Sequence, residues 1–286
     1  MDEQWQAGFR VDGLIAPIQD TVVRDRILIR GIAPIDSAYV FFKLSDASEQ
    51  EQDKIRAELT HTLATISQIY SLITNRHTEV LSSSVLGPIN SENTFGHTRY
   101  PPDMLGFMAV PTDTQRQESV LLISMAIDKY EIVKEQSKDS RRQFLRNAID
   151  YYNRYLGDTR LEEKLIDLII CLESLFSIET QELRLRYSIR LSQFLGSIRE
   201  SEIPTIFKVV HDLYGKRNQV VHGMERVDID ERKIVTLAGY LKDAIKCFIH
   251  IEGTKKDTIK LLDESVYDSD KRVKLKKLVA ESIRHW

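Results

Sequence analysis

Residues 206–223, with the sequence IFKVVHDLYGKRNQVVHG, predict one helix that ends at Gly223. Glycine is common just after a helix end because it adopts the left-handed backbone conformation at little cost. We expect one face of this helix, including Val220 and Val221, to turn into a core. Gly215 weakens the prediction, since glycine is a poor helix former. A helical C-terminal part follows if the neighbouring segments show the same pattern.

The segments around this helix do show a helical pattern. After Pro111 the chain contains only one further proline, Pro204, and the apolar residues recur at helical spacing. The longest apolar run, residues 165–176 (LIDLIICLESLF), is interrupted by Asp167 and Glu173 and is too short to span a bilayer. The predicted helices are residues 118–135, 139–155, 161–178, 182–197, 203–222 and 228–252, with a further pair at 255–265 and 270–284.

The first hundred residues have a different character. Residues 9–44 are rich in strand signals, namely alternating apolar and charged residues and a β-branched and aromatic run. One amphipathic helix follows over residues 48–73, and residues 75–116 predict short strands and loops. The sequence therefore predicts an α+β fold. A strand-rich α/β domain of unknown role would cover residues 1–115, and an all-α helical bundle would cover 116–286.

The composition is that of an ordinary soluble protein, with 286 residues, 42% hydrophobic and 29% charged. A net charge of −3 argues against a general nucleic-acid coat protein, but it leaves room for an enzyme that engages a few phosphates. Cys171 and Cys247 lie in apolar helical sequence, as small core residues of a reducing compartment do. The polar, acidic start of the chain lacks a signal-peptide pattern. We expect a cytoplasmic protein without a membrane segment.

Three polar residues near the end of the 206–223 helix are the candidates for catalysis. Asn218 and His222 are four positions apart and therefore share one helix face, while the long side chain of Arg217 can reach across to it. The helix dipole favours a protonated imidazole at His222. The planar guanidinium of Arg217 suits a phosphate group. The alternative is an ordinary helix end with a solvated or paired arginine.

These residue types suit RNA cleavage without a metal ion or another cofactor. In that reaction a base takes the proton of the 2′-hydroxyl, an acid protonates the leaving 5′-oxygen, and a cation holds the phosphate charge. His222 could be the acid or the base, and Arg217 could hold the phosphate. One histidine cannot fill both roles in one step, so a symmetric dimer would supply the second. Arg56 and His61 have the same spacing without the following asparagine, which we interpret as chance.

Three blocks of sequence resemble one family. LIDLIICLESLFS (165–177), LRLRYSIRLSQFLG (183–196) and the 206–223 helix are similar, in order and spacing, to the HEPN superfamily and its Apea-like group, over roughly 118–252. The resemblance implies a helical bundle that forms homodimers and acts as a metal-independent endoribonuclease on RNA (tRNA or mRNA), often in prokaryotic antiviral defence. It carries over Arg217, Asn218 and His222. Some relatives have lost catalysis, so the alternative is a non-catalytic RNA-binding, dimerisation or sensor module.

Several residues outside this motif are weaker candidates. Glu173 would support Arg217 or another arginine, or would pair with Arg186 or Arg190 for stability alone. The candidates for binding the RNA backbone are Arg142, Arg146 and Lys216. The alternative for the first two is an amphipathic helix with its arginines in water. The basic residues 271–278 could contact RNA or an acidic partner, although a solvated helix face is commoner. No zinc-ligand spacing is present in the sequence, so we expect no metal site.

Overall fold

The computed structural model divides into two compact units, Met1–Tyr130 and Glu131–Trp286. The division falls inside one helix, α3 (Asp113–Ser137), whereas the sequence predicts a boundary between residues 115 and 116. The described residues are 5–12, 14, 21–23, 27–31, 37–43, 49–86, 113–137, 143–178, 181–224 and 227–286.

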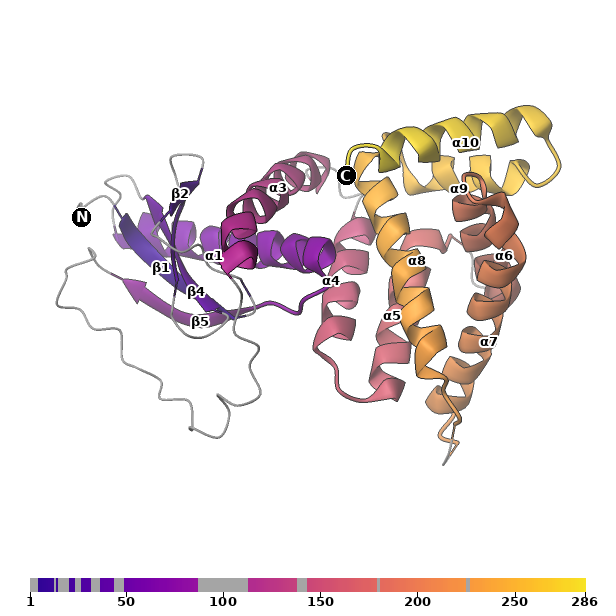
Figure 1. Ribbon diagram of the computed structural model, residues 1–286, viewed down its shortest axis with the longest axis horizontal. Coiled ribbons are helices and arrows are strands. Elements are labelled where there is room, and N and C mark those ends of the chain that lie inside the picture. Colours follow the sequence, from indigo (N-terminus) through magenta and orange to yellow (C-terminus); the bar gives the residue numbers. More distant parts are fainter. Residues whose placement is uncertain are drawn as a thin grey trace. The chain divides into compact units, whose positions relative to one another are not determined.

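The N-terminal unit contains an antiparallel sheet of five strands over its described residues, in the order β2-β3-β4-β1-β5 (Figure 1). The strands are β1 (Trp5–Asp12), β2 (Thr21–Val23), β3 (Ile27–Gly31), β4 (Ser37–Lys43) and β5 (Glu79–Leu86). The first four account for the strand signals in residues 9–44. Val11 of β1 and Val40 of β4 are buried, as expected for a sheet with one face on a core.

Two helices complete the described part of this unit. Helix α1 (Glu49–Thr74) confirms the predicted amphipathic helix and packs against β1 and β5. Its residues Leu63, Ile66 and Ile69 are buried. A hydrogen bond of 2.9 Å joins the hydroxyl oxygens of Thr62 in α1 and Tyr130 in α3.

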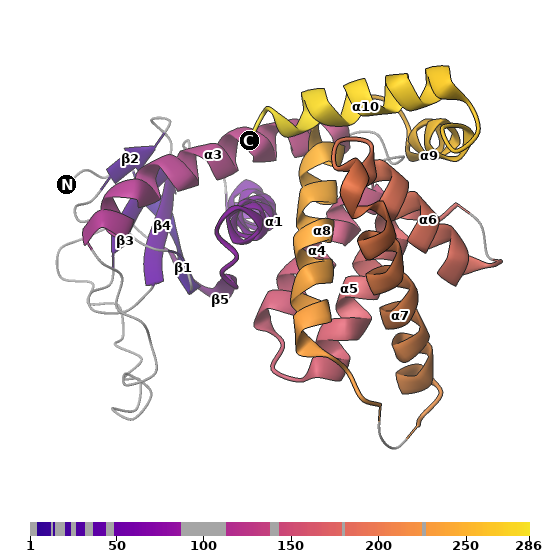
Figure 2. The same ribbon diagram turned by 45° about the vertical axis from the view of Figure 1, so that its right-hand side comes forward.

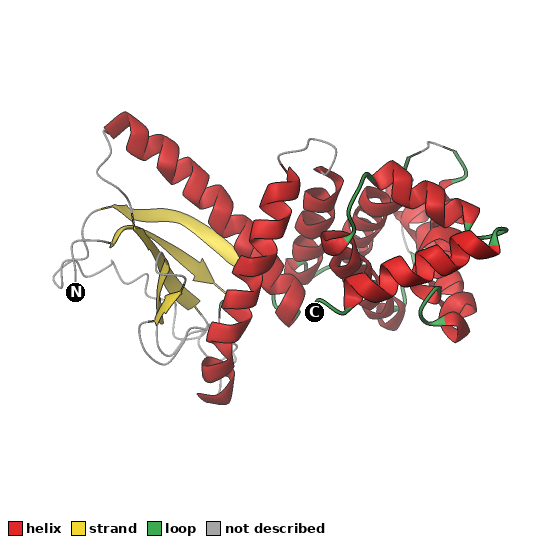
Figure 3. Ribbon diagram, turned by 90° about the horizontal axis from the view of Figure 1, so that it is seen from above, coloured by secondary structure: helices red, strands yellow, loops and turns green. Residues whose placement is uncertain are grey.

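The predicted α+β class is wrong, because helices outweigh strands in the described part of the chain. Nine α-helices are present among the described residues, and every described strand belongs to the N-terminal unit (Figure 3). Side-chain burial is described without long interruptions in residues 58–78, 118–134 and nearly all of 143–286. In these ranges the structure consists of helices and the segments that connect them. The fold is therefore predominantly α-helical, because helices cover far more of the described residues than the strands do.

The C-terminal unit is a bundle of helices that follows the predicted segments closely. Helix α7 lies against α6 on one side and α8 on the other (Figure 2). The elements are α4 (Gln143–Gly157), α5 (Leu161–Phe176), α6 (Leu183–Gly196), the 3₁₀ turn η2 (Glu200–Glu202), α7 (Ile203–Val221), α8 (Glu231–His250), α9 (Lys255–Glu264) and α10 (Ser269–Ile283).

Helix α5 is the centre of this bundle. It contacts α4, α6, α7, α8 and α9, which explains why the run LIDLIICLESLF is apolar nearly all round. At its C-terminal end Phe176 packs edge-on against Phe194 of α6 and Phe248 of α8, with ring centroids 5.6 and 5.5 Å away. This aromatic cluster packs α5, α6 and α8 against one another and so helps to position α6, the helix that precedes α7.

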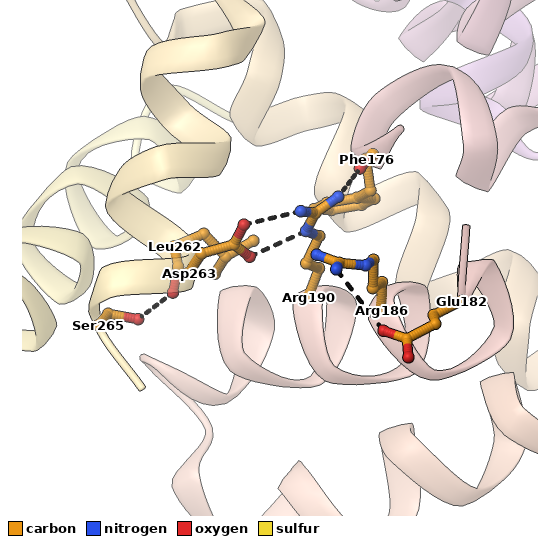
Figure 4. A network of polar contacts seen from close by, with 7 residues as sticks. All are labelled: Phe176, Glu182, Arg186, Arg190, Leu262, Asp263 and Ser265. Atoms are coloured by element: carbon orange, nitrogen blue, oxygen red, sulfur yellow. Dashed lines mark hydrogen bonds and ion pairs between the residues drawn. The ribbon is translucent and has the colours of Figure 1, made fainter. Parts of the chain in front are cut away.

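A buried ion pair ties α6 to α9. The Arg190 side chain is 1% exposed, and its guanidinium donates to both carboxylate oxygens of Asp263 at 2.9 and 2.7 Å (Figure 4). A third donor reaches the main-chain oxygen of Phe176 at 2.8 Å. Arg190 therefore supports the bundle rather than a site for RNA.

Asp167 of α5 is a buried carboxyl group whose ionisation we expect to weaken the fold. Burial, reinforced by the nearby carboxyl group of Asp158, raises the pKa of Asp167 to about 7, against the opposing effect of Arg154. The folded chain therefore keeps a proton that the unfolded chain releases above its ordinary pKa near 3.8. Stability contributed by this group is present at low pH and is lost as the pH rises towards 7.

The substitution Asp167→Asn removes the loss of stability that accompanies ionisation of this carboxyl group. We expect it to raise the free energy of unfolding at pH 8 by about 1 to 2 kcal/mol and to change it little at pH 4. Urea unfolding of both proteins at the two pH values measures the difference. Asp270→Asn, at an exposed position of α10, is the control and should not stabilise the protein at pH 8. Equal effects of Asp167→Asn at pH 4 and pH 8 would contradict the account.

The two cysteines are free and buried in the C-terminal unit, as predicted for small core residues. Burial raises the pKa of both thiols, so Cys171 and Cys247 stay protonated at neutral pH. In the part of the chain that the structure describes, no helix combines the length and the apolar character needed to cross a membrane.

Candidate functional site

Helix α7 ends in a way that presents His222 to solvent. The amide of Gly223 donates to the main-chain oxygen of Val220 at 3.0 Å, and that of Met224 donates to Gln219 at 3.2 Å. Gly223 has a φ of 75°, in the left-handed region that favours glycine. These two bonds are the Schellman pattern of a helix C-terminus. The helix therefore stops within one residue of the predicted end, and His222 is the exposed capping residue.

The three predicted catalytic residues lie on the last part of α7, although no described side-chain contact joins His222 to Arg217 or Asn218. Arg217 and Asn218 are half-buried, and a guanidinium nitrogen of Arg217 donates to the Asn218 side-chain oxygen at 3.4 Å. His222 follows one turn after Asn218. The prediction that Val221 turns into the core is wrong, since it is 54% exposed. The exposed end of α7 thus combines one apolar side chain, one imidazole and a neighbouring guanidinium.

Tyr214 holds Arg217 from the buried side. The guanidinium carbon of Arg217 lies 5.9 Å from the centre of the Tyr214 ring, within cation–π range. The Tyr214 hydroxyl donates to a carboxylate oxygen of Glu173 in α5 at 2.9 Å. Burial, followed by the charge of Glu173, raises the pKa of Tyr214, so its hydroxyl stays protonated and remains a donor. Glu173 is therefore connected to Arg217 through Tyr214.

The alternative partners predicted for Glu173 are corrected by the structure. Arg186 pairs with Glu182 at 3.6 Å, and Arg190 pairs with Asp263 (Figure 4). Neither arginine therefore provides the salt bridge to Glu173 that the sequence allowed. The spacing of residues along α5 and α6 could not show this, because the deciding partner of Arg190 comes from α9, more than seventy positions later in the chain.

The weaker RNA-binding candidates are not gathered at one place. Arg142 lies outside the described residues. Arg146 is half-buried on α4, a helix that packs on α5 and α8, so no described contact brings it to the end of α7. Lys216 differs from both, because it lines a cavity beside the end of α7.

This cavity has a volume of about 480 Å³ and lies where α6, α7, the start of α8 and the segment before α8 meet. Its wall is mostly polar. One part of the wall is fixed by an ion pair of 2.8 Å between Lys233 and Asp212. The charged and amide side chains that line it include Arg184, Asp212, Lys216, Gln219, Asp228 and Lys233.

The Arg184 side chain extends from α6 to the cavity and is hydrogen-bonded to α7. Its Nε donates to the main-chain oxygen of His211 at 2.8 Å, and one terminal nitrogen lies 3.0 Å from His211 Nδ1. Because a guanidinium has no acceptor, that imidazole nitrogen must accept. A Cβ atom at Gly215 would lie 3.0 to 3.3 Å from the guanidinium atoms. Gly215 is therefore tolerated in the middle of a helix because its bare backbone makes room for Arg184.

Two glycines within helices offer a matched test of the close approach between Arg184 and Gly215. Gly239 of α8 is exposed, and nothing lies within 4 Å of a Cβ placed there. We expect Gly239→Ala to raise the free energy of unfolding by about 0.5 to 1 kcal/mol, which is the usual gain in helix propensity. Gly215→Ala should gain at least about 0.5 kcal/mol less, because it displaces Arg184. Urea unfolding measures both variants, and equal stabilisation would contradict the contact.

Sequence reasoning missed Tyr214, Arg184 and Gln219 as parts of this region. Gly215 was the available signal, since a glycine in a strongly predicted helix often marks a close approach by another group. Tyr214 carried no signal of its own, because a buried aromatic residue at helical spacing looks like an ordinary core residue.

Comparison of the chain with models of protein families, with curated proteins and with solved structures finds no match. The resemblance to HEPN proteins therefore remains a prediction carried by three blocks of sequence. Across the described ranges, no group of three or more His, Cys, Asp or Glu side chains is placed to hold a metal ion.

Proposed function

We propose that the protein is an endoribonuclease that cleaves RNA by attack of a 2′-hydroxyl on the neighbouring phosphate, using Arg217 and His222. The observation that carries this proposal is the end of α7. There an exposed imidazole follows one turn after an asparagine whose side-chain oxygen accepts a hydrogen bond of 3.4 Å from the guanidinium of Arg217. The Tyr214 ring lies within cation–π range of that guanidinium, and Glu173 accepts a hydrogen bond from the Tyr214 hydroxyl.

The chemistry assigns a role to each group. The guanidinium of Arg217 binds the scissile phosphate and offsets the charge that builds on it. His222 transfers a proton, either from the attacking 2′-hydroxyl or to the leaving 5′-oxygen. The 2′-oxygen forms a bond to phosphorus, and the bond from phosphorus to the 5′-oxygen breaks. The products are a 2′,3′-cyclic phosphate and a 5′-hydroxyl end.

A second proton-transfer group is needed, and a symmetric homodimer would supply it as the second His222. The surface around His222 favours a protein contact, since Val221 and Met224 are 54% and 55% exposed. Exposed apolar side chains of this kind are common at the centre of interfaces. His222 itself is also exposed rather than buried against its own helices, as a residue offered to a partner and to RNA must be.

A cleavage assay tests the proposal. Purified protein is incubated with total tRNA and with mixed mRNA in excess EDTA, beside Arg217→Ala and His222→Ala. The proposal expects cleavage by the wild-type protein that survives EDTA and is lost in both variants. Equal cleavage by all three proteins would place the activity elsewhere. Binding of RNA by the wild-type protein without cleavage would favour the non-catalytic module, the alternative within the same resemblance.

A further inference from the structure

We propose that the cavity between α6, α7 and the start of α8 binds one nucleotide, through its phosphate and its ribose hydroxyls. Its volume of about 480 Å³ lies within the range of small-ligand sites. Its polar wall suits a phosphorylated sugar better than an apolar cofactor. The placement of that nucleotide within an RNA strand rests on the proposed function, whereas the binding chemistry does not.

Arg184 and Lys216 are the groups that fit a phosphate. Two of the five N–H donors of Arg184 are used on His211, which fixes the guanidinium and leaves three donors. Lys216 forms no ion pair with any residue that the structure describes. A fixed guanidinium beside a lysine is a favourable arrangement for a phosphate, because its planar fork is ordered before the ligand arrives.

The acidic residues of the cavity differ in whether their carboxylates have a described partner. Asp212 is engaged by Lys233, and Asp230 accepts from the amide of Arg232 at 3.0 Å as the N-cap of α8. Asp228 has no partner within the described ranges. The charged side chains of the wall outside the Lys233–Asp212 ion pair are therefore Arg184, Lys216, Asp228 and Asp230, and of these two carboxylates only Asp228 has no described hydrogen bond. A carboxylate accepts hydrogen bonds from hydroxyl groups, so Asp228 fits the 2′- or 3′-hydroxyl of a ribose.

The cavity lies beside the proposed catalytic histidine. Gln219 lines it, and His222 follows three positions later on the same side of the helix end. Lys216 lies one turn before Gln219 on that side of α7, whereas the next residue, Arg217, points about 100° away around the helix. An RNA strand that passes from His222 along the Gln219 and Lys216 side of α7 would place a nucleotide next to the scissile one in the cavity.

Binding of RNA, measured without cleavage, tests this proposal. The protein is His222→Ala, so that RNA is not consumed, and the probe is a short fluorescein-labelled single-stranded RNA followed by anisotropy. We expect Arg184→Gln or Lys216→Gln to weaken binding by about 10-fold, the usual effect of losing one charge-assisted contact. Lys208→Gln, an exposed lysine on the same helix outside the cavity, is the control and should change binding less than 2-fold.

Two further arms identify the ligand chemistry. Asp228→Asn should reduce the preference for the RNA over a DNA of the same sequence, because it removes the acceptor for a 2′-hydroxyl. Adenosine 5′-monophosphate, titrated alone, distinguishes a free nucleotide from one within a strand. If Arg184→Gln weakens binding of the free nucleotide but not of RNA, the site is nucleotide-specific and separate from the RNA path.

The proposal is overturned if the Arg184, Lys216 and Asp228 variants bind both RNA and adenosine 5′-monophosphate as their parent does. That result would leave the proposed cleavage untouched, because the residues at the end of α7 are unchanged in these comparisons. Conversely, loss of RNA binding in the cavity variants would support this site even if the wild-type protein cleaves no RNA.

Discussion

Replacing His222 by alanine is expected to lower RNA cleavage by about 10²- to 10⁴-fold, the usual contribution of a positioned acid or base. The residue caps α7 and is exposed, so its imidazole is free to meet a substrate rather than packed in the core. Its backbone bonds at the helix end are main-chain contacts and do not depend on the side chain. The initial rate of cleavage of a labelled RNA, in EDTA, measures the effect.

Two controls separate chemistry from folding in this experiment. The free energy of unfolding of His222→Ala should lie within about 0.5 kcal/mol of the wild-type value, as is usual for surface substitutions. His285→Ala removes another exposed histidine, at the end of the chain, and should cleave at the wild-type rate. A well-folded His222→Ala protein with full activity would remove His222 from the mechanism.

Replacing Arg190 by methionine is expected to lower the free energy of unfolding by about 3 to 5 kcal/mol, the usual cost of breaking a buried ion pair. The change removes both bonds to Asp263 and leaves the main-chain oxygen of Phe176 without this donor (Figure 4). Asp263 is 42% exposed and can be rehydrated, so the loss should lie towards the lower end of that range. Urea unfolding of the C-terminal unit within the whole chain provides the measurement.

The matched control for this change is Arg160→Met. Arg160 also pairs with carboxylates, but its side chain is 67% exposed, so its loss should cost less than about 0.5 kcal/mol. A similar, small effect of both substitutions would show that the Arg190 pair does not hold α6 to α9. RNA cleavage at a temperature where both variants are folded should be unchanged, because no described contact joins Arg190 to Arg217, Asn218 or His222.

The helices of the C-terminal unit were predictable because each carries a periodic apolar face or, in α5, an apolar surface all round. The end of helix α7 was predictable to within one residue, since Gly223 marks the left-handed turn that ends it. The fold class was not predictable in the same way. Local patterns in residues 9–44 indicate strands, but they do not show how small a share of the fold those strands form.

The candidate site was predictable only where neighbours in sequence are neighbours on one helix. Asn218 and His222 are four positions apart, and that spacing alone places them on one face. Tyr214 and Arg217 are also close on α7, three positions apart, but the hydrogen bond from Tyr214 to Glu173 depends on how α7 packs against α5. The direction of Val221 was missed because the helix ends there and its last turn leaves the core.

One helix, α7, serves both packing and the proposed chemistry. The first part of α7 buries Ile206, Val210 and Leu213 against the bundle, which fixes the helix and the side chains that extend from its end. The exposed end then carries the imidazole, and the cavity on the neighbouring side carries the uncommitted cations Arg184 and Lys216. Rigid support behind an exposed set of groups is what positioned catalysis requires.

The end groups of the RNA fragments test the central claim most directly. A labelled RNA is cleaved by the wild-type protein in excess EDTA, and the 3′ ends of the products are analysed beside those from Arg217→Ala. The account predicts 2′,3′-cyclic phosphate and 5′-hydroxyl ends that are absent with the variant. Products with 3′-hydroxyl and 5′-phosphate ends, or cyclic ends formed equally by Arg217→Ala, would contradict it.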